Sequence, residues 1–278
     1  MPGIERIHRP TRREFFENWV IPGKTVLLTG LMDAWPAMGK WTPEFFARIG
    51  GERKTRIEFG NVLQDAPRFE EWELGRYINH ILHGLDPNGG PVPYLAYFDI
   101  FKFFPELRAD VDFSFWKGRI RFPIGWIGPA GSYTGLHYDI APNLFAQFHG
   151  SKEFLLYPPS QTACMYPSRR YDIGSVLSDV DARKPDYHRY PRFREAQGME
   201  AVVEPGQMLF TPRGWWHQVR GLEMSISVSC FGFSIADTLL RGIPGAVKHA
   251  LHGMGWYRKG ECACHMTDRI GATHDRSA

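Results

Sequence analysis

The sequence predicts a mainly β protein with flanking helices, and three observations lead to this fold class. Aromatic residues make up 14% of the 278 residues, and 21 Pro and 29 Gly accompany them, a composition that suits short strands joined by turns better than a helical bundle. From about residue 122 onward, short apolar runs are separated by turn residues. In residues 224–231 apolar residues alternate with Ser225, Ser227 and Ser229, which puts the serines on one face of a strand. A serine face suits a barrel interior and equally suits a solvent face.

Composition excludes several classes of protein. With 43% hydrophobic and 23% charged residues, the chain can bury a sizeable core and is not globally disordered. The 33 basic against 30 acidic residues leave a net charge of +3, too small to indicate wholesale attraction to nucleic acid or to a membrane. No run approaches the ~20 apolar residues of a membrane span, and residues 1–13 lack the apolar segment of a secretory signal. Four cysteines are too few and too clustered for a disulfide framework. We therefore expect a cytoplasmic protein with no membrane partner.

The first third of the chain, residues 1–115, predicts a mixture of helices and strands. Thr11 and Glu14 form a capping-box pattern at the start of a helix. Thr42, Pro43 and Glu44 begin a second helix, which ends at Gly50. The remaining expected elements of this region are strands over 24–30, 56–59 and 94–100, a helix over 69–82 and a turn over 86–90.

Residues 116–233 predict the β core. We expect strands over 122–128, 136–139, 144–149, 153–157, 201–203, 207–211, 216–220 and 224–231. The charged, tyrosine-rich segment 161–198 is too long for an ordinary turn, so we interpret it as a functional insertion or lid. Within 234–278, residues 236–254 predict helix interrupted at Pro244 and Gly245, and the tail from Arg258 is expected to be frayed.

The segment Gly135-Leu136-His137-Tyr138-Asp139 carries the chemistry. Residues two apart in a strand point the same way, so His137 and Asp139 project together while Tyr138 points to the opposite side. A third ligand is expected from His217, in the run Arg213-Gly214-Trp215-Trp216-His217. Two histidines and one carboxylate form the facial triad that suits non-haem Fe(II) and leaves open positions on the metal. A His-x-Asp spacing alone is weak and depends on its context.

That context is a resemblance to a known family. Residues 133–159 (Tyr133-Thr-Gly-Leu-His-Tyr-Asp through Tyr157-Pro-Pro159) resemble the metal-binding core of the JmjC/cupin-like Fe(II)- and 2-oxoglutarate-dependent oxygenases. Within the family they are most similar to the asparaginyl hydroxylase type, factor inhibiting HIF. Residues 185–193 and the Trp215-Trp216-His217 run extend the match, which covers roughly 94–231. The resemblance implies a double-stranded β-helix, the jelly-roll core of the cupin and JmjC proteins.

The resemblance also assigns residues. His137, Asp139 and His217 match the iron ligands, which are the catalytic centre. Four further residues match the family's co-substrate contacts: Lys152, Thr134 and Tyr94 at the distal carboxylate of 2-oxoglutarate, and Asn143 near its metal-bound end. A buried carboxylate needs a cation and hydrogen-bond donors, which independently suits Lys152. Ser229 stands where the asparaginyl hydroxylase has a second asparagine, so the detailed co-substrate geometry departs from that pattern.

The implied activity is hydroxylation of an unactivated C–H bond with Fe(II), 2-oxoglutarate and O₂. A protein or peptide side chain is the favoured substrate, hydroxylated at the β-carbon of Asn, Asp or His. Related enzymes demethylate lysines or act on small molecules or on a modified tRNA base, although the near-neutral charge argues against nucleic acid. A non-catalytic cupin-like binding module would be expected to have lost a ligand or Lys152. A metal-dependent cupin enzyme that does not use 2-oxoglutarate would not need Lys152 and Thr134.

The ligand spacing favours one domain over two. Ligands at 137, 139 and 217 and a co-substrate contact at 94 require one barrel spanning most of residues 1–278. The helical 236–254 segment is expected to make a homodimer contact, as C-terminal helices do in the resembled family. Cys262, Cys264 and His265 lack the second ligand pair of a structural zinc site, so metal binding is not favoured there.

Overall fold

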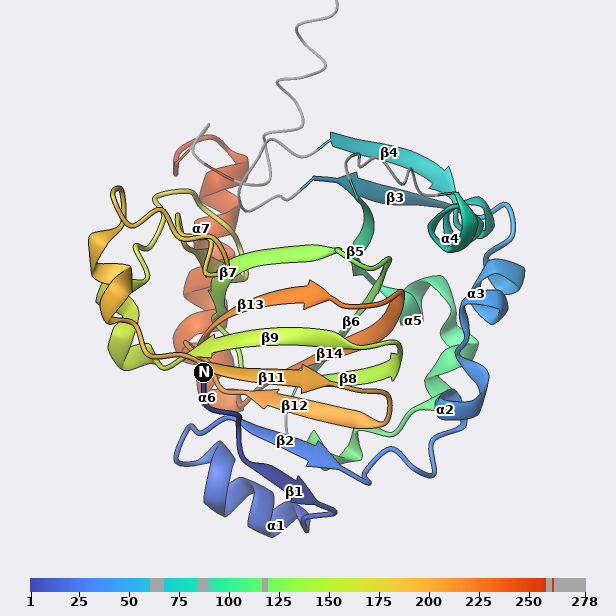
Figure 1. Ribbon diagram of the computed structural model, residues 1–278, viewed down its shortest axis with the longest axis horizontal. Coiled ribbons are helices and arrows are strands. Elements are labelled where there is room, and N and C mark those ends of the chain that lie inside the picture. The colour runs from blue at the N-terminus through green and yellow to red at the C-terminus, as the bar shows by residue number, and fades with distance from the viewer. Residues whose placement is uncertain (61–67, 85–89, 91, 117–119, 259–261, 263–278) are drawn as a thin grey trace, which may run out of the picture.

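Two facing β-sheets form the centre of the computed structural model, which describes residues 1–60, 68–84, 90, 92–116, 120–258 and 262 (Figure 1). The larger sheet has the strand order β1-β2-β12-β8-β14-β6-β5-β3-β4, and the smaller has the order β10-β7-β13-β9-β11. The strands are β1 (Arg6–His8), β2 (Val26–Thr29), β3 (Lys54–Phe59), β4 (Arg68–Glu73), β5 (Pro93–Phe98), β6 (Ile120–Gly128), β7 (Tyr133–Asp139), β8 (Asn143–His149), β9 (Lys152–Tyr157), β10 (Ser175–Leu177), β11 (Met199–Val203), β12 (Gln207–Thr211), β13 (Trp216–Gly221) and β14 (Ser225–Phe233).

Helices and helical turns surround the sheets. The α-helices are α1 (Arg12–Phe15), α2 (Pro36–Lys40), α3 (Pro43–Gly50), α4 (Leu74–His83), α5 (Ile100–Phe103), α6 (Ile235–Asp237) and α7 (Ile243–Gly253). The 3₁₀ and π turns are η1 (Phe16–Val20), η2 (Pro105–Asp110), η3 (Phe113–Trp116), η4 (Pro159–Cys164), η5 (Pro191–Glu195) and η6 (Thr238–Gly242). Within the described residues, no helix has the length and apolar character needed to cross a membrane.

The core strands wind as a jelly roll. Along the chain, β6, β7, β8 and β9 alternate between the larger and the smaller sheet, and β11, β12, β13 and β14 alternate in the same way. Their ladders, such as β14 with β6 and β8 and β13 with β7 and β9, are antiparallel. This winding confirms the predicted mainly β fold with a double-stranded β-helix core. In Figure 1 the smaller sheet lies in front, α2 to α5 lie at one end, and the insertion and α7 lie at the other.

The serine face of β14 points into the barrel. Ser225, Ser227 and Ser229 are almost fully buried, at 0%, 0% and 3% exposure. Ile226 and Val228, on the opposite face, pack into the large apolar core formed with the N-terminal region. Both faces of the strand are therefore covered, and the alternation that was ambiguous in the sequence marks a polar barrel interior.

The N-terminal region extends the larger sheet at both edges. Strands β1 and β2 continue it beyond β12, while β5, β3 and β4 continue it beyond β6. Antiparallel pairing of Leu95 with Ile127 fixes β5 against β6. As a result Tyr94, far upstream of the metal-ligand motif, lies against the barrel that holds it. The predicted capping box of Thr11 with Glu14 and the Thr42 cap before Pro43 are both confirmed.

Three expected elements differ from the structure. The predicted 69–82 helix is wrong over its first part, because Arg68–Glu73 form β4 and pair with β3. The helix begins only at Leu74, where the apolar periodicity begins. The insertion 161–198 is not wholly irregular, since it contains η4, η5 and the sheet strand β10. Pro244 and Gly245 do not end the C-terminal helix, because α6, η6 and α7 follow one another without a gap and Pro244 lies where the π turn η6 passes into α7.

Other expectations lie at the limits of the described chain. Of the predicted 86–90 turn, all but Gly90 lies outside the described residues. The tail after Arg258 does as well, except Cys262, which is buried and bridges to Tyr171. The cluster of Cys262 with Cys264 and His265 therefore cannot be described as a group, and the prediction that it binds no metal stays a prediction.

Candidate metal centre

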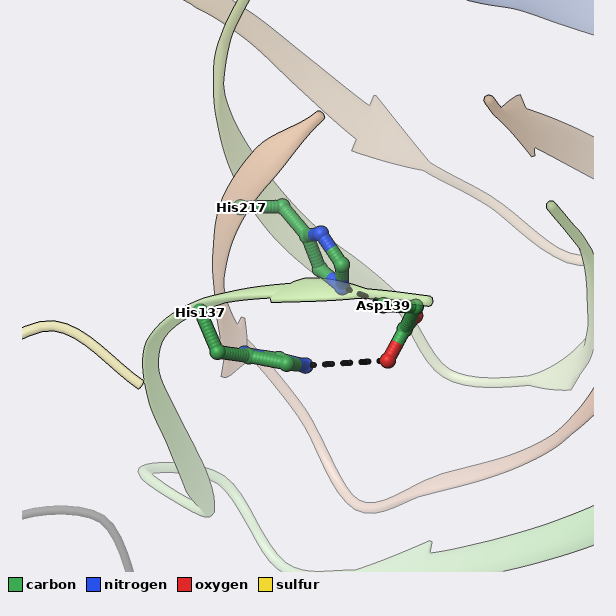
Figure 2. A group of neighbouring side chains, drawn as sticks. All are labelled: His137, Asp139 and His217. Atoms are coloured by element: carbon green, nitrogen blue, oxygen red, sulfur yellow. Dashed lines mark ion pairs between the residues drawn. The ribbon is translucent and has the colours of Figure 1, made fainter. Parts of the chain in front are cut away.

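His137, Asp139 and His217 converge on one point inside the barrel (Figure 2). His137 and Asp139 come from the end of β7, where the strand period of two directs both side chains inward. His217 comes from the neighbouring strand β13, whose register pairs it with His137. Tyr138, between the two β7 ligands, faces the other way and packs edge-on against Trp216. Pairing of these two strands therefore assembles the three predicted ligands.

The distances suit a single metal ion. Asp139 Oδ1 lies 3.7 Å from His137 Nε2, and Asp139 Oδ2 lies 3.5 Å from His217 Nε2. One potential ligand atom from each of the three residues lies within 4.8 Å of the others. All three side chains are buried, at 5%, 8% and 4% exposure. A divalent cation at the centre of these atoms would be held from one side by two nitrogens and one carboxylate, with the other positions open.

Backbone carbonyls orient both imidazoles. His137 Nδ1 lies 2.8 Å from the Gly135 carbonyl, and His217 Nδ1 lies 3.0 Å from the Trp215 carbonyl. Because a carbonyl only accepts, Nδ1 carries the proton in each ring and Nε2 presents its lone pair. Burial lowers the pKa of each histidine to about 4. Both rings are therefore neutral near pH 7, the form that binds a metal.

Among the described residues, the carboxylate of Asp139 is paired only with the two neutral histidines. Burial raises the pKa of Asp139 to about 6, an effect only partly opposed by His137. A cation bound between the three ligands would reverse this effect, because it favours the ionised carboxylate. The donor set and its electrostatics thus both fit a divalent metal.

Lys152 occupies the far part of the same pocket. It begins β9, is 1% exposed, and its Nζ donates to Tyr94 Oη at 3.1 Å and Ser227 Oγ at 3.0 Å. Thr134 is hydrogen-bonded to Tyr94. Within the described chain, no acidic side chain forms an ion pair with Lys152, and burial lowers its pKa to about 7. A buried amine with hydroxyl neighbours and no carboxylate is a site prepared for an anion.

A second hydrogen-bond group lies near the metal ligands. Asn143 Nδ2 and Trp126 Nε1 both donate to Ser229 Oγ, at 3.2 Å and 3.0 Å. Asn143 Oδ1 is buried and has no hydrogen-bond partner in the part of the chain that the structure describes. A buried acceptor without a partner is costly unless a ligand supplies a donor. Ser229, which departs from the family pattern, is thus integrated into the pocket wall.

One pocket unites the predicted residues. The three ligands, Lys152, Thr134, Tyr94 and Asn143 all line it. The structure therefore brings together every site residue that the sequence predicted, although it does not test their roles. Sequence reasoning did not single out Ser227, Trp126 or Tyr97. The serine alternation of 224–231 was a usable signal for Ser227, whereas nothing in the local sequence identifies Trp126 or Tyr97 as pocket residues.

The fold and this set of side chains define a cupin-type metal centre, and comparison with known proteins identifies the family. Residues 12–232 match the cupin-like domain model, so the chain belongs to the cupin-like domain family. The chain is 35% identical over 240 residues to Lysine-specific demethylase 8 of Xenopus tropicalis, covering 81% of the chain and 52% of that protein. It is 33% identical over 230 residues to Lysine-specific demethylase JMJ30 of Arabidopsis thaliana, covering 81% and 53%. It is 36% identical over 222 residues to human HSPB1-associated protein 1, covering 70% and 45%.

The chain spans about half the length of these relatives. The expected JmjC/cupin-like family is confirmed, whereas a specific similarity to the asparaginyl hydroxylases is not shown. Fe(II) and 2-oxoglutarate are the cofactor and co-substrate of the JmjC proteins, and the His137, Asp139 and His217 set fits that chemistry.

Proposed function

We propose that this protein is an Fe(II)- and 2-oxoglutarate-dependent oxygenase that hydroxylates an unactivated C–H bond. The observation that carries the proposal is the buried Lys152, which has no carboxylate partner among the residues that the structure describes and lines the same pocket as the three metal ligands. A pocket that bound only a metal ion would not require a buried amine, which is costly to bury. When bound, the iron and co-substrate supply the oxidising chemistry.

The chain's own residues bind and orient. His137, Asp139 and His217 would hold the iron on one side and leave the pocket side free. Lys152, with hydroxyls from Tyr94 and Thr134, would neutralise and direct the distal carboxylate of 2-oxoglutarate. Asn143 would contact the metal-bound end through the second N–H of its amide, because 2-oxoglutarate offers only acceptors there, and its Oδ1, which has no partner among the described residues, would accept from a donor on the substrate or from water. All these groups except the half-buried Thr134 are buried, which excludes bulk water from the reacting atoms.

For the substrate we propose a protein or peptide side chain, hydroxylated at the β-carbon of Asn, Asp or His. Demethylation of a methylated lysine is a second candidate, favoured by the relatives named lysine-specific demethylases. The two share a hydroxylation step, since oxidation of an N-methyl group gives an unstable hemiaminal that releases formaldehyde. A small molecule, a modified tRNA base and a non-catalytic binding role are the alternatives that the experiment must separate.

Succinate formation tests the function. The protein is purified anaerobically, supplied with Fe(II), 2-oxoglutarate and air, and compared with His137→Ala and with the remote surface variant Lys184→Ala. We expect succinate from the wild type and from Lys184→Ala, and loss of it in His137→Ala. Succinate at the level of His137→Ala, with a peptide pool present, would reject the oxygenase function. Where succinate forms, the product mass separates the substrates: one added oxygen marks hydroxylation, and a lost CH₂ marks demethylation.

We also propose a homodimer through the C-terminal helices. Leu239, Leu240, Ile243 and Val247 on η6 and α7 are 54–70% exposed, an apolar face that favours a partner. Sedimentation of the intact chain should show a dimer, and a Leu239→Glu/Val247→Glu variant should be monomeric. The matched variant His249→Glu places charge on an exposed polar position and should remain dimeric. A monomeric wild type would reject the contact.

Finally, we propose a reducing, cytoplasmic location. Cys164 and Cys230 are free thiols, as expected of a protein that does not depend on oxidative folding. Localisation of a tagged chain by cell fractionation would test this assignment.

A further inference from the structure

A second cavity lies between the 161–198 insertion and α7, and it is unusually basic. Its volume is about 400 Å³, and its lining includes three cationic side chains, Arg170, Lys248 and Arg258. The one carboxylate in the lining, Asp172, already accepts hydrogen bonds from Ser175 Oγ at 2.7 Å and the Gly174 N–H at 3.3 Å. The whole chain has 33 basic against 30 acidic residues, so this local excess of positive charge is not the average of the molecule. We call this cavity the basic pocket.

Tertiary packing holds the two walls of the basic pocket together. The ring of Tyr171, from the insertion, contacts the rings of His252 at 4.5 Å and Tyr257 at 5.5 Å. His252 is 1% exposed, and its Nδ1 lies 2.6 Å from the Tyr257 carbonyl, which fixes the chain after α7. Arg258 Nη1 then donates to the Arg169 carbonyl at 2.6 Å. The cations of the two segments are therefore held around one cavity.

The chemistry of the lining fits an oxyanion. Lys248 forms no ion pair within the described residues. Leu240, Pro244 and Lys248 are spaced one helical turn apart, so they lie on one face of the helix and line the pocket together. Arg170 contributes a planar guanidinium, which matches carboxylate and phosphate geometry, and the Ser168 hydroxyl lies beside it. Like charges gathered around a cavity repel one another, and an anion between them removes that repulsion.

The basic pocket is connected to the metal centre through one loop. Asp172 and Ile173 line it on one side and line an adjoining cavity of about 480 Å³ on the other. Tyr97 lines both that adjoining cavity and the metal pocket. The same loop leads directly into β10, where Ser175 pairs with the metal ligand Asp139. A bound peptide that extended from the metal pocket through the adjoining cavity would pass Asp172 and Ile173 and reach the basic pocket.

We infer that the basic pocket binds a phosphate or carboxylate group carried by the peptide substrate, at a fixed separation from the residue that is oxidised. This inference rests on the proposed function for the identity of the ligand, whereas the anion site itself stands on the geometry of the pocket. The recognised group is an acidic side chain or a phosphorylated residue, since both present the same oxyanion chemistry to Arg170 and Lys248.

Calorimetry with inorganic phosphate at low ionic strength tests the anion site without any turnover. The intact wild-type chain should bind phosphate saturably, and Lys248→Glu should weaken binding by about tenfold or more, the loss expected for a charge-assisted contact. Lys184→Glu makes the same charge change on an exposed part of the insertion and should bind within about twofold of wild type. No saturable binding by the wild type, or an equal loss in both variants, would overturn the site.

A peptide library tests the link to the substrate. After incubation with Fe(II), 2-oxoglutarate and air, oxidised peptides identified by mass spectrometry should be enriched in Asp, Glu or phosphoserine at one fixed offset. Arms with and without phosphatase treatment separate the carboxylate from the phosphate source. The enrichment should disappear in Lys248→Glu and persist in Lys184→Glu. Phosphate binding with oxidised peptides but no enrichment would assign the pocket to a free anion and overturn the substrate role. No oxidised peptide at all, with phosphate binding intact, would reject the peptide-oxygenase function while leaving the anion site standing.

Discussion

The amine of Lys152 is enclosed by Tyr94, Ser227 and the apolar rings of the barrel, and no described acidic side chain forms an ion pair with it. Burial lowers its pKa to about 7, far below its ordinary value of 10.5. In the empty protein the amine is therefore largely neutral above pH 7. A dicarboxylate that binds beside it favours the charged form, so binding above pH 7 requires the amine to take up a proton.

This linkage predicts the pH dependence of co-substrate binding. As pH rises above 7, the dissociation constant of 2-oxoglutarate should increase by up to about tenfold per pH unit, because each binding event consumes one proton. Calorimetry at pH 8 in two buffers of different ionisation enthalpy should report proton uptake approaching one per ligand. Lys152→Arg supplies the control, since a guanidinium stays charged throughout this range. Equal proton uptake by Lys152→Arg and wild type would contradict the assignment.

Removal of the Lys152 amine should separate binding from stability. Lys152→Met keeps the stem of the side chain and removes a buried group that prefers to be charged. We expect 2-oxoglutarate binding to fall by at least about tenfold while urea denaturation at pH 6 shows no loss of stability. At that pH, below the folded-state pKa of about 7, the amine is charged in both states and its burial is most costly. If Lys152→Met lost as much free energy of unfolding as free energy of 2-oxoglutarate binding, Lys152 would have a structural role.

For individual residues, the sequence predicts the site only where a local pattern or a family motif identifies the side chain. His137 and Asp139 share a strand face by the period of two, His217 is the candidate third ligand that completes a facial triad, and Lys152 is expected from the family resemblance. Lys152 donates to Ser227 across the barrel, 75 positions away in the chain, and Trp126 donates to Ser229 on the neighbouring strand, 103 positions away. Such contacts depend on the winding of the two sheets, which no local pattern specifies.

Among the elements, β10 shows how an insertion supports the metal centre. Its register places Ser175 opposite Asp139 and Val176 opposite Tyr138. On either side, the Ile140 N–H donates to the Gly174 carbonyl at 3.1 Å and the Ser178 N–H donates to the Leu136 carbonyl at 2.8 Å. The sequence predicted a long irregular segment here, because three residues of strand among charged and turn residues have too little periodicity to be recognised. The strand forms because β7 offers it an edge.

Strand pairing with a distant part of the chain also explains the error at residues 69–82. The apolar positions that predict the helix begin at Leu74, and the residues before it instead form β4, which pairs with β3 over six residue pairs. Trp72 then packs on Phe59 of that neighbouring strand. Tertiary pairing overrides local propensity in such cases, whereas the capped helices at Thr11 and Thr42 depend on contacts within one turn and were predicted correctly.

The β10 pairing leads to a prediction for the metal. Val176→Pro removes a backbone donor from this short ladder and restricts the backbone beside Asp139. We expect metal affinity, measured with Mn(II) by calorimetry, to fall about tenfold, a typical effect of disturbing the groups that orient a ligand. Val176→Thr keeps the backbone donor and the branched shape, and should bind metal as the wild type does. Unchanged affinity in Val176→Pro would show that β10 does not orient Asp139.

At the scale of the whole molecule, the fold depends on turns that carry the chain from one sheet to the other. Gly150 and Ser151 link β8 of the larger sheet to β9 of the smaller, which begins at Lys152. The φ of Gly150 is +61°, a conformation that L side chains rarely adopt, and an added Cβ would overlap the Met224 carbonyl at the start of β14. This turn therefore has both a conformational and a steric requirement for glycine.

Gly150→Ala should destabilise the molecule by about 2 kcal/mol or more, since the strain of a positive φ adds to a clash with backbone that cannot move aside. Urea denaturation followed by tryptophan fluorescence would measure the loss. Gly131→Ala is the matched control, because its φ of +81° carries the same conformational strain while no atom lies within 4 Å of an added Cβ. It should cost only about 1 kcal/mol. The difference between the two variants isolates the contact between the β8–β9 turn and Met224, and equal losses would show that the turn can shift without disturbing the barrel.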